Sequence, residues 1–185
     1  RVLLISGDTG VGKTRVAREL IARLSGERDA PVAVMRQSCY EEDRGTPYGI
    51  VAELLDGAIE TGKVSVPVAA EIRNTIVSML QRVAPEKEPG SPPPADEIVG
   101  HWHLHRRLLE AIREVRAGRP LVIALDDLHW CDDASLQLFV DIVRRINDRP
   151  VLLVLTVRSG IHSPALALAL AEMRASGKLD ELAQK

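Results

Sequence analysis

Apolar residues follow two patterns along this chain, and the alternation of the two predicts its fold. Residues 2–5, 121–125 and 151–155 are apolar at every position, as expected of strands that helices cover on both faces. In the segments around these runs, apolar residues recur every three or four positions with charged residues between them, which is typical of amphipathic helices. Strands that alternate with helices in this way predict an α/β fold with a parallel sheet.

The same patterns give bounds for the individual elements. We predict strands at residues 2–5, 32–37, 121–125 and 151–158, and helices at residues 12–24, 47–59, 68–83 and 98–117. A further helix follows Asp132 or Asp133, either of which can cap it. The last helix begins at Ser163 and Pro164, a capping residue followed by a proline in the first turn. Residues 84–97 hold five prolines, which lack the backbone donor, so we predict a loop within the domain there.

The segment Gly7–Thr14 carries the clearest chemistry. It fits the phosphate-loop pattern GxxxxGK[ST] without a mismatch, in the order Gly7, Asp8, Thr9, Gly10, Val11, Gly12, Lys13, Thr14. The glycines let backbone N–H groups surround a polyphosphate, Lys13 reaches the β- and γ-phosphates, and the Thr14 hydroxyl reaches Mg²⁺. A predicted strand precedes the segment and a predicted helix follows it, so the amides of the helix N-terminus also face the anion. The segment predicts binding of a nucleoside triphosphate.

Two further strand ends supply the second half of a site. The apolar strand at 121–125 ends in Asp126 and Asp127, the form of a Walker B motif, and ligands of parallel sheets bind at that edge. We expect Asp126 to hold Mg²⁺, and Asp127 to orient or deprotonate the attacking water; the alternative is that the pair caps the next helix. Arg158 ends the last strand and could approach the γ-phosphate, or else be a solvated or salt-bridged arginine. Thr156 is a weaker candidate, equally at home as a strand residue.

The composition narrows the class of protein. With 185 residues, of which 45% are hydrophobic, we expect one domain over residues 1–185. Arg1 already lies beside the first strand and no Met precedes it, so we expect a fragment of a longer protein. The net charge of −2 argues against direct nucleic-acid binding by this segment. A local basic patch is an alternative that the net charge does not test. No apolar run reaches the ~18 residues of a membrane span and no signal peptide is visible, so we expect a cytoplasmic protein without a membrane partner.

Other reactive side chains carry weaker signals. His101 and His105 share a helix face but lack a third metal ligand, so a solvated or amphipathic helix start is favoured. His129 and its neighbour Trp130 stand beside the carboxylates, where packing or a contact with a neighbouring element is favoured over direct catalysis. Cys39 and Cys131, Tyr40 and Tyr48 have no motif support for a metal site, a disulfide or a nucleotide contact.

With these residues assembled, the chain resembles the AAA-like ATPase module of STAND proteins, the signal-transduction ATPases with numerous domains. The resemblance rests on the segment Gly7–Thr14 and on residues 125–132, which read Leu-Asp-Asp-Leu-His-Trp-Cys-Asp. Residues 46–49, 119–120 and 156–158 support it. The form it resembles most is the module of large ATP-dependent LuxR-type transcriptional regulators and of cyclase-linked bacterial ATPases.

This resemblance implies a P-loop NTPase three-layer sandwich of the ASCE and AAA type, with a mostly parallel central sheet whose last core strand is missing. It implies ATP or ADP and Mg²⁺ as ligands, with Thr14 and Asp126 at the metal and Asp127 and Arg158 acting in hydrolysis and sensing. The resemblance also implies an upstream segment that helps to seat adenine, which we do not find among residues 1–185. The expected partners are the C-terminal helical, winged-helix and output domains of the same chain. Self-association on ATP binding is a further alternative.

We therefore expect an ATP-binding switch module with slow, Mg²⁺-dependent hydrolysis, in a multidomain signalling protein that controls transcription. An ATPase module linked to an adenylate or guanylate cyclase is one alternative. A P-loop small-molecule kinase and a nucleic-acid-acting AAA ATPase are the others. A kinase would need an acceptor pocket and lid arginines, and a ring-forming ATPase would need an arginine supplied by a neighbour.

Overall fold

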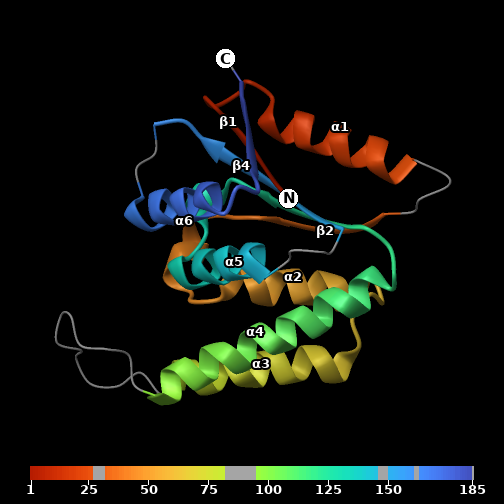
Figure 1. Ribbon diagram of the computed structural model, residues 1–185, viewed down its shortest axis with the longest axis vertical. Helices are drawn as coiled ribbons and strands as arrows, with labels where there is room; N and C mark the ends of the chain where they lie inside the picture. Colours follow the sequence, from red (N-terminus) through yellow and green to blue (C-terminus); the bar gives the residue numbers. More distant parts are fainter. Residues whose placement is uncertain (27–31, 82–94, 146–149, 161–162, 185) are drawn as a thin grey trace.

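A parallel sheet of five strands forms the centre of the part of the molecule that the structure describes (Figure 1). This computed structural model describes residues 1–26, 32–81, 95–145, 150–160 and 163–184. The strands lie in the order β2-β3-β4-β1-β5. Their bounds are β1 Val2–Gly7, β2 Ala33–Ser38, β3 Leu121–Asp126, β4 Val151–Arg158 and β5 Leu179–Ala183. Because each neighbouring pair is parallel, all the carboxyl ends meet at one edge of the sheet.

The strand β5 corrects the prediction that the last core strand is missing. It pairs in parallel with β1, from Val2 opposite Leu179 to Ser6 opposite Ala183. Its sequence, Leu-Asp-Glu-Leu-Ala, has no continuous apolar run, and most of its side chains are exposed at the edge of the sheet. The strand is therefore specified by its backbone pairing with β1, and the hydrophobic pattern alone could not reveal it.

Helices cover both faces of the sheet in unequal numbers (Figure 1). The helix α1 (Lys13–Gly26) lies on one face, and α2 (Gly49–Glu60), α5 (Asp133–Arg145) and α6 (Pro164–Ala175) lie on the other. Beyond them, α3 (Val66–Gln81) and α4 (Ala95–Arg116) lie side by side as a further layer. The two short helices η1 (Glu41–Gly45) and η2 (Leu128–Trp130) follow β2 and β3. This arrangement confirms the predicted α/β fold.

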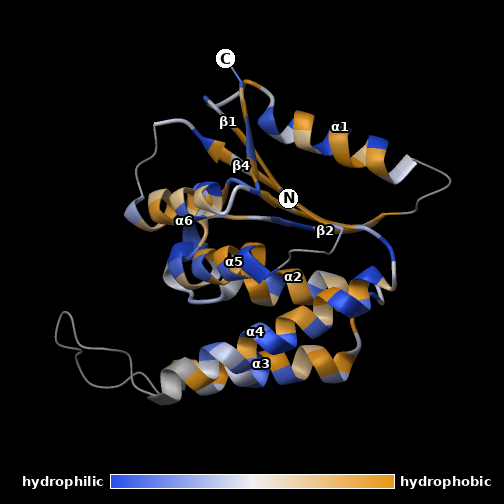
Figure 2. Cartoon of the chain, viewed as in Figure 1, coloured by the Kyte–Doolittle hydropathy of each residue, from blue (hydrophilic) through white to orange (hydrophobic). Residues whose placement is uncertain are grey.

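The sheet divides the core into two parts. Hydrophobic residues colour much of the strands and part of each helix around them (Figure 2). The larger part lies under α2, α4, α5 and α6, and includes the fully buried Leu55, Leu104 and Leu138. The smaller part lies between α1 and the strands, where Ile21 of α1 packs near Ile5 and Val154. None of the helices within the described ranges is long and apolar enough to cross a membrane.

The capping residues predicted for the last two helices agree with the structure, whereas α4 begins three residues before its predicted start. Asp132 caps α5, because its Oδ1 accepts a hydrogen bond from the Ser135 N–H at 2.8 Å. The Ser163 hydroxyl accepts one from the Leu166 N–H at 3.3 Å at the start of α6. The first part of the predicted loop at 84–97 lies outside the described residues. Its last three positions belong to the first turn of α4, which begins at Ala95.

Candidate nucleotide site

The phosphate loop connects the end of β1 to the start of α1. Gly10 and Gly12 have φ angles of +86° and +97°, which other residues rarely adopt. A Cβ at Gly7 would lie 2.7 Å from the carbonyl oxygen of Gln184, so this position also requires glycine. Lys13 is 8% exposed, and its Nζ donates to the Asp8 carbonyl at 2.8 Å. The ammonium group thus lies within the curve of the loop, where a lysine of this motif meets phosphate.

Thr156 fixes the backbone and one carboxylate at the end of β3. The neighbouring strands β3 and β4 are in register, with Leu125 opposite Leu155, so the next residues also stand opposite each other. The Thr156 hydroxyl donates a short hydrogen bond to Asp126 Oδ1 and accepts one from the Asp127 N–H at 2.9 Å. Sequence reasoning had ranked Thr156 as a weak candidate. The sequence feature that identifies Thr156 is a single hydroxyl in an otherwise apolar run, at the position opposite the carboxylate.

The chain turns sharply after β3. Asp127 has a left-handed backbone, with φ +54° and ψ +47°, a conformation that aspartate tolerates better than most residues. The turn leads directly into η2 and leaves the Asp127 side chain 47% exposed. The carboxylate of Asp127 therefore faces the open edge of the sheet, whereas that of Asp126 is held against Thr156.

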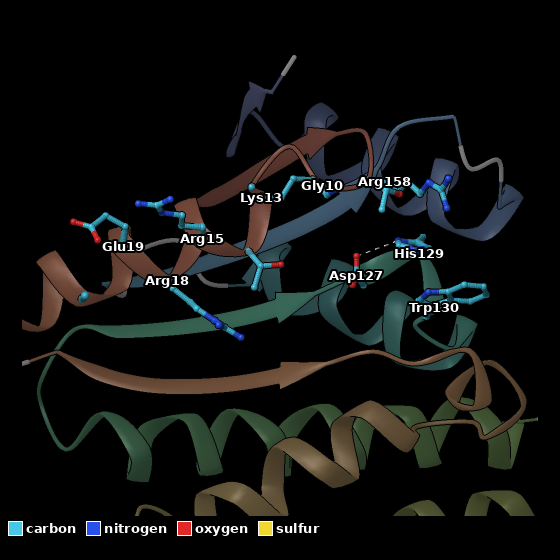
Figure 3. A pocket seen from close by; sticks show the side chains of 13 residues that line it. Gly10, Lys13, Arg15, Arg18, Glu19, Asp127, His129, Trp130 and Arg158 are labelled. Carbon is cyan, nitrogen blue, oxygen red and sulfur yellow. Dashed lines mark ion pairs between the residues drawn. The ribbon is translucent and has the colours of Figure 1, made fainter.

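One cavity of about 890 Å³ brings most of the predicted residues together (Figure 3). Lys13 and Thr14 line it from the phosphate loop, Asp127 from the end of β3 and Arg158 from the end of β4. An adjoining cavity of about 340 Å³ is lined by Asp126 together with Thr14. The two cavities share Thr14, so the residues predicted to hold the metal stand together beside the larger cavity.

His129 and Trp130 also line the larger cavity (Figure 3). The side chain of His129 is 4% exposed, and its Nδ1 lies 3.9 Å from Asp127 Oδ1. Burial lowers the pKa of His129, an effect that Asp127 opposes. Arg44 of η1 reaches across to this segment: its guanidinium donates to the His129 carbonyl and lies 4.7 Å from the centre of the Trp130 ring. The sequence pattern gave no signal for Arg44.

A comparison with protein-family models decides what kind of domain this is. The model of the AAA ATPase domain matches residues 1–154, which hold the phosphate loop and both carboxylates. The chain belongs to the AAA ATPase domain family. Nucleotide binding by a P-loop fold is thereby supported, and the use of Mg²⁺ is usual in such a family.

This AAA ATPase domain is similar to parts of larger proteins. It is 29% identical over 178 residues to an uncharacterized protein of Rhizobium meliloti (strain 1021), covering 91% of this chain and 17% of that protein. It is also similar to the Aeropyrum pernix ORC1 protein, whose structure was solved in complex with DNA. There the identity is 21% and the TM-score 0.51, over 99% of this chain and 39% of that one. At this identity the likeness concerns the fold alone.

The remaining candidates of the AAA ATPase domain have structural partners. His105 is buried and its Nε2 lies 2.9 Å from Asp141 Oδ2 of α5, so it is packed rather than solvated. Tyr48 is buried, and its hydroxyl lies 3.2 Å from His101 Nδ1. Within the described ranges, no three His, Cys, Asp or Glu side chains are grouped closely enough to hold a metal ion.

The two cysteines of the AAA ATPase domain are buried and free. A hydrogen bond from the Cys131 thiol to Cys39, together with burial, raises the pKa of Cys131. A thiol with a raised pKa is a poor nucleophile. We therefore assign Cys131 to packing, like the buried Cys39 in the same part of the core.

Proposed function

We propose that this domain binds ATP with Mg²⁺ and hydrolyses it slowly, as the switch module of a multidomain signalling protein. The observation that carries this proposal is the meeting of two distant segments at one edge of the sheet. Lys13 of the phosphate loop lines the same cavity as Asp127 and Arg158, which follow more than a hundred positions later in the sequence. A phosphate loop alone would support binding, whereas a carboxylate and an arginine facing the same cavity also support hydrolysis.

Each residue has a distinct role in this proposal. The N–H groups of the loop from Gly7 to Thr14 and the Lys13 ammonium hold the phosphates. The oxygens of Thr14 and Asp126 suit Mg²⁺, which prefers oxygen ligands and would neutralise charge on the phosphates. Asp127 orients the attacking water from its exposed position at the turn. Arg158, exposed at the end of β4 and opposite Gly7 in register, contacts the γ-phosphate and reports its loss.

The signalling role rests on the sequence around the carboxylates. The run Asp-Asp-Leu-His-Trp resembles STAND ATPases of LuxR-type transcriptional regulators, in which ATP and ADP favour different domain arrangements. The matched part is only 17% of the Rhizobium meliloti protein described above, so most of that protein lies outside the match. We propose that the protein is cytoplasmic and that its output is transcriptional control. Cyclase-linked signalling is the alternative. The partners are helical, winged-helix and output domains of the same chain.

The hydrolysis claim is tested by phosphate release. Mg²⁺-ATP is incubated with the wild type and with Asp127→Asn, and inorganic phosphate and ATP affinity are measured. We expect slow release by the wild type, a loss of about 100-fold or more in the variant, and unchanged affinity. Equal rates in the two proteins would refute the role of Asp127. ADP that forms only when a small acceptor is added, without release of inorganic phosphate, would favour a kinase.

The switch claim needs a separate measurement. Small-angle scattering of the full-length protein in ATP and in ADP compares its domain arrangement in the two states. We expect a change in the radius of gyration between them. Identical scattering curves in ATP and ADP would remove the basis for a switch.

A further inference from the structure

The imidazole of His129 has a buried nitrogen without a hydrogen-bond partner. Its Nδ1 is buried and makes no hydrogen bond to any described residue. A buried polar nitrogen left unpaired costs about 1–3 kcal/mol, so such an atom calls for an explanation. The polar atom facing it is Oδ1 of Asp127, at 3.9 Å. This separation is about 1 Å longer than a hydrogen bond.

The backbone of His129 is held from a different part of the chain. Arg44 donates to the His129 carbonyl from Nε at 3.3 Å and from Nη2 at 2.8 Å. Its guanidinium also lies over the ring of Trp130, and the rings of His129 and Trp130 have centres 5.1 Å apart. The imidazole is thus fixed in place, with its side chain 4% exposed.

Asp127 is the exposed member of the pair. Its side chain is 47% exposed, and its carboxylate accepts no hydrogen bond within the described part of the chain, although its N–H is held by Thr156. Oδ1 of Asp127 would have to move by about 1 Å to come within hydrogen-bond distance of Nδ1. In this way a fixed donor can select one orientation of a free acceptor.

The charges around His129 favour the neutral ring. Burial lowers its pKa; Asp127 raises it, and the cations of Arg44, Lys13 and Arg158 lower it further. These neighbours come from η1, the phosphate loop and the end of β4, so the ring is faced by positive charge from three elements. A neutral imidazole carries one N–H, and an acceptor beside Nδ1 favours the tautomer with the proton there.

We propose that His129 is a positioning residue, which donates its Nδ1–H to Asp127 and thereby fixes the carboxylate that orients the attacking water. This proposal deepens the hydrolytic function proposed above and rests on it. Arg44 contributes to this positioning, because it holds the backbone of His129 from outside the cavity. The consequence is that η1, which follows β2, is coupled to the geometry of hydrolysis.

The test compares three substitutions at one position. In His129→Asn the amide nitrogen stands near the place of Nδ1, in His129→Gln near that of Nε2, and His129→Ala removes both. Single-turnover hydrolysis of saturating Mg²⁺-ATP is measured, with ATP affinity and melting temperature as controls for folding. We expect the Gln and Ala variants to be slower by about 10-fold to 100-fold, and the Asn variant to stay within about threefold of the wild type, with equal ATP affinities.

A role in packing alone predicts a different result. In that case Asn and Gln would slow hydrolysis equally, or neither would, and either result overturns the proposal while leaving ATP hydrolysis intact. Ring ¹⁵N chemical shifts give a second, hydrolysis-independent readout, with the His129 signals assigned by their loss in His129→Asn. We expect the proton on Nδ1 in the wild type and a changed shift in Asp127→Asn. If the wild type hydrolyses no ATP, the proposed function fails. A proton on Nε2 in both the wild type and Asp127→Asn would refute the hydrogen bond between His129 and Asp127.

Discussion

The phosphate loop and the turn after β3 face the same cavity, but the chain specifies them in different ways. The loop depends on its own residues, since Gly10 and Gly12 supply left-handed conformations and Lys13 contacts the carbonyl of Asp8 within the same segment. The turn after β3 depends on residues far away in the sequence. Thr156 holds Asp126 and Asp127, and Arg44 holds His129. A sequence motif therefore identifies the loop, whereas in the second region it identifies the carboxylates but not the distant residues that hold them.

The largest effect is expected where the turn meets β4. Thr156→Val keeps the shape of a side chain that is 1% exposed but removes its hydrogen bonds to Asp126 and Asp127. The Asp126 carboxylate and the Asp127 N–H then lack their hydrogen-bond partner, which should lower the free energy of unfolding by about 3 kcal/mol. Denaturant titration checks this, with Thr156→Ser as the control that keeps the hydroxyl. Equal stability of the Val and Ser variants would contradict the role of the hydroxyl.

A smaller loss is expected at the start of the loop. In Gly7→Ala the new Cβ would stand 2.7 Å from the Gln184 carbonyl oxygen, so β1 or the end of β5 must shift, at a cost of about 2 kcal/mol. Gly57→Ala on α2 is the matched control, because a Cβ there meets nothing within 4 Å. Thermal unfolding of both variants measures the difference. A Gly7→Ala variant as stable as Gly57→Ala would show that the loop tolerates a side chain.

Arg44 tests whether η1 supports the turn. Arg44→Ala removes the hydrogen bonds to His129 and the stacking on Trp130, for an expected loss of about 1 kcal/mol. It should also slow ATP hydrolysis. Arg106→Ala is a close control, because Arg106 stacks on the exposed Trp102 of α4 at 5.5 Å, outside the nucleotide cavity. If both variants hydrolyse ATP at the same rate, η1 has no part in the site.

The smallest effect is a pH dependence of stability. Because burial lowers the pKa of His129 in the folded state, the unfolded chain binds the additional proton first as the pH falls. Stability should therefore decrease as the pH drops below the ordinary histidine pKa of about 6.5. His129→Asn should lack this part of the decrease, which the difference between the two denaturation curves from pH 5 to 8 measures. Parallel curves over that range would mean that His129 does not titrate on unfolding.

The sequence predicts much of the fold because three of the strands contain a continuous apolar run and the helices are periodic. It misses β5, whose polar residues are held by pairing with β1. It predicts the phosphate loop and the pair Asp126 and Asp127, because each is a local pattern. The hydrogen bond between Thr156 and Asp126 depends on the register of β3 and β4. The one between Arg44 and His129 depends on the contact between η1 and η2. Neither can be predicted from the spacing of residues in the sequence.

The central claim is that Lys13 and the loop around it hold the phosphates of ATP. Calorimetric titration of Mg²⁺-ATP into the wild type and into Lys13→Ala tests it most directly, with Arg23→Ala as a control on the exposed face of α1. Loss of a charged hydrogen-bond donor to phosphate should weaken binding by about 10-fold or more, while Arg23→Ala should bind as the wild type does. Equal affinity of the wild type and a folded Lys13→Ala variant would contradict the account.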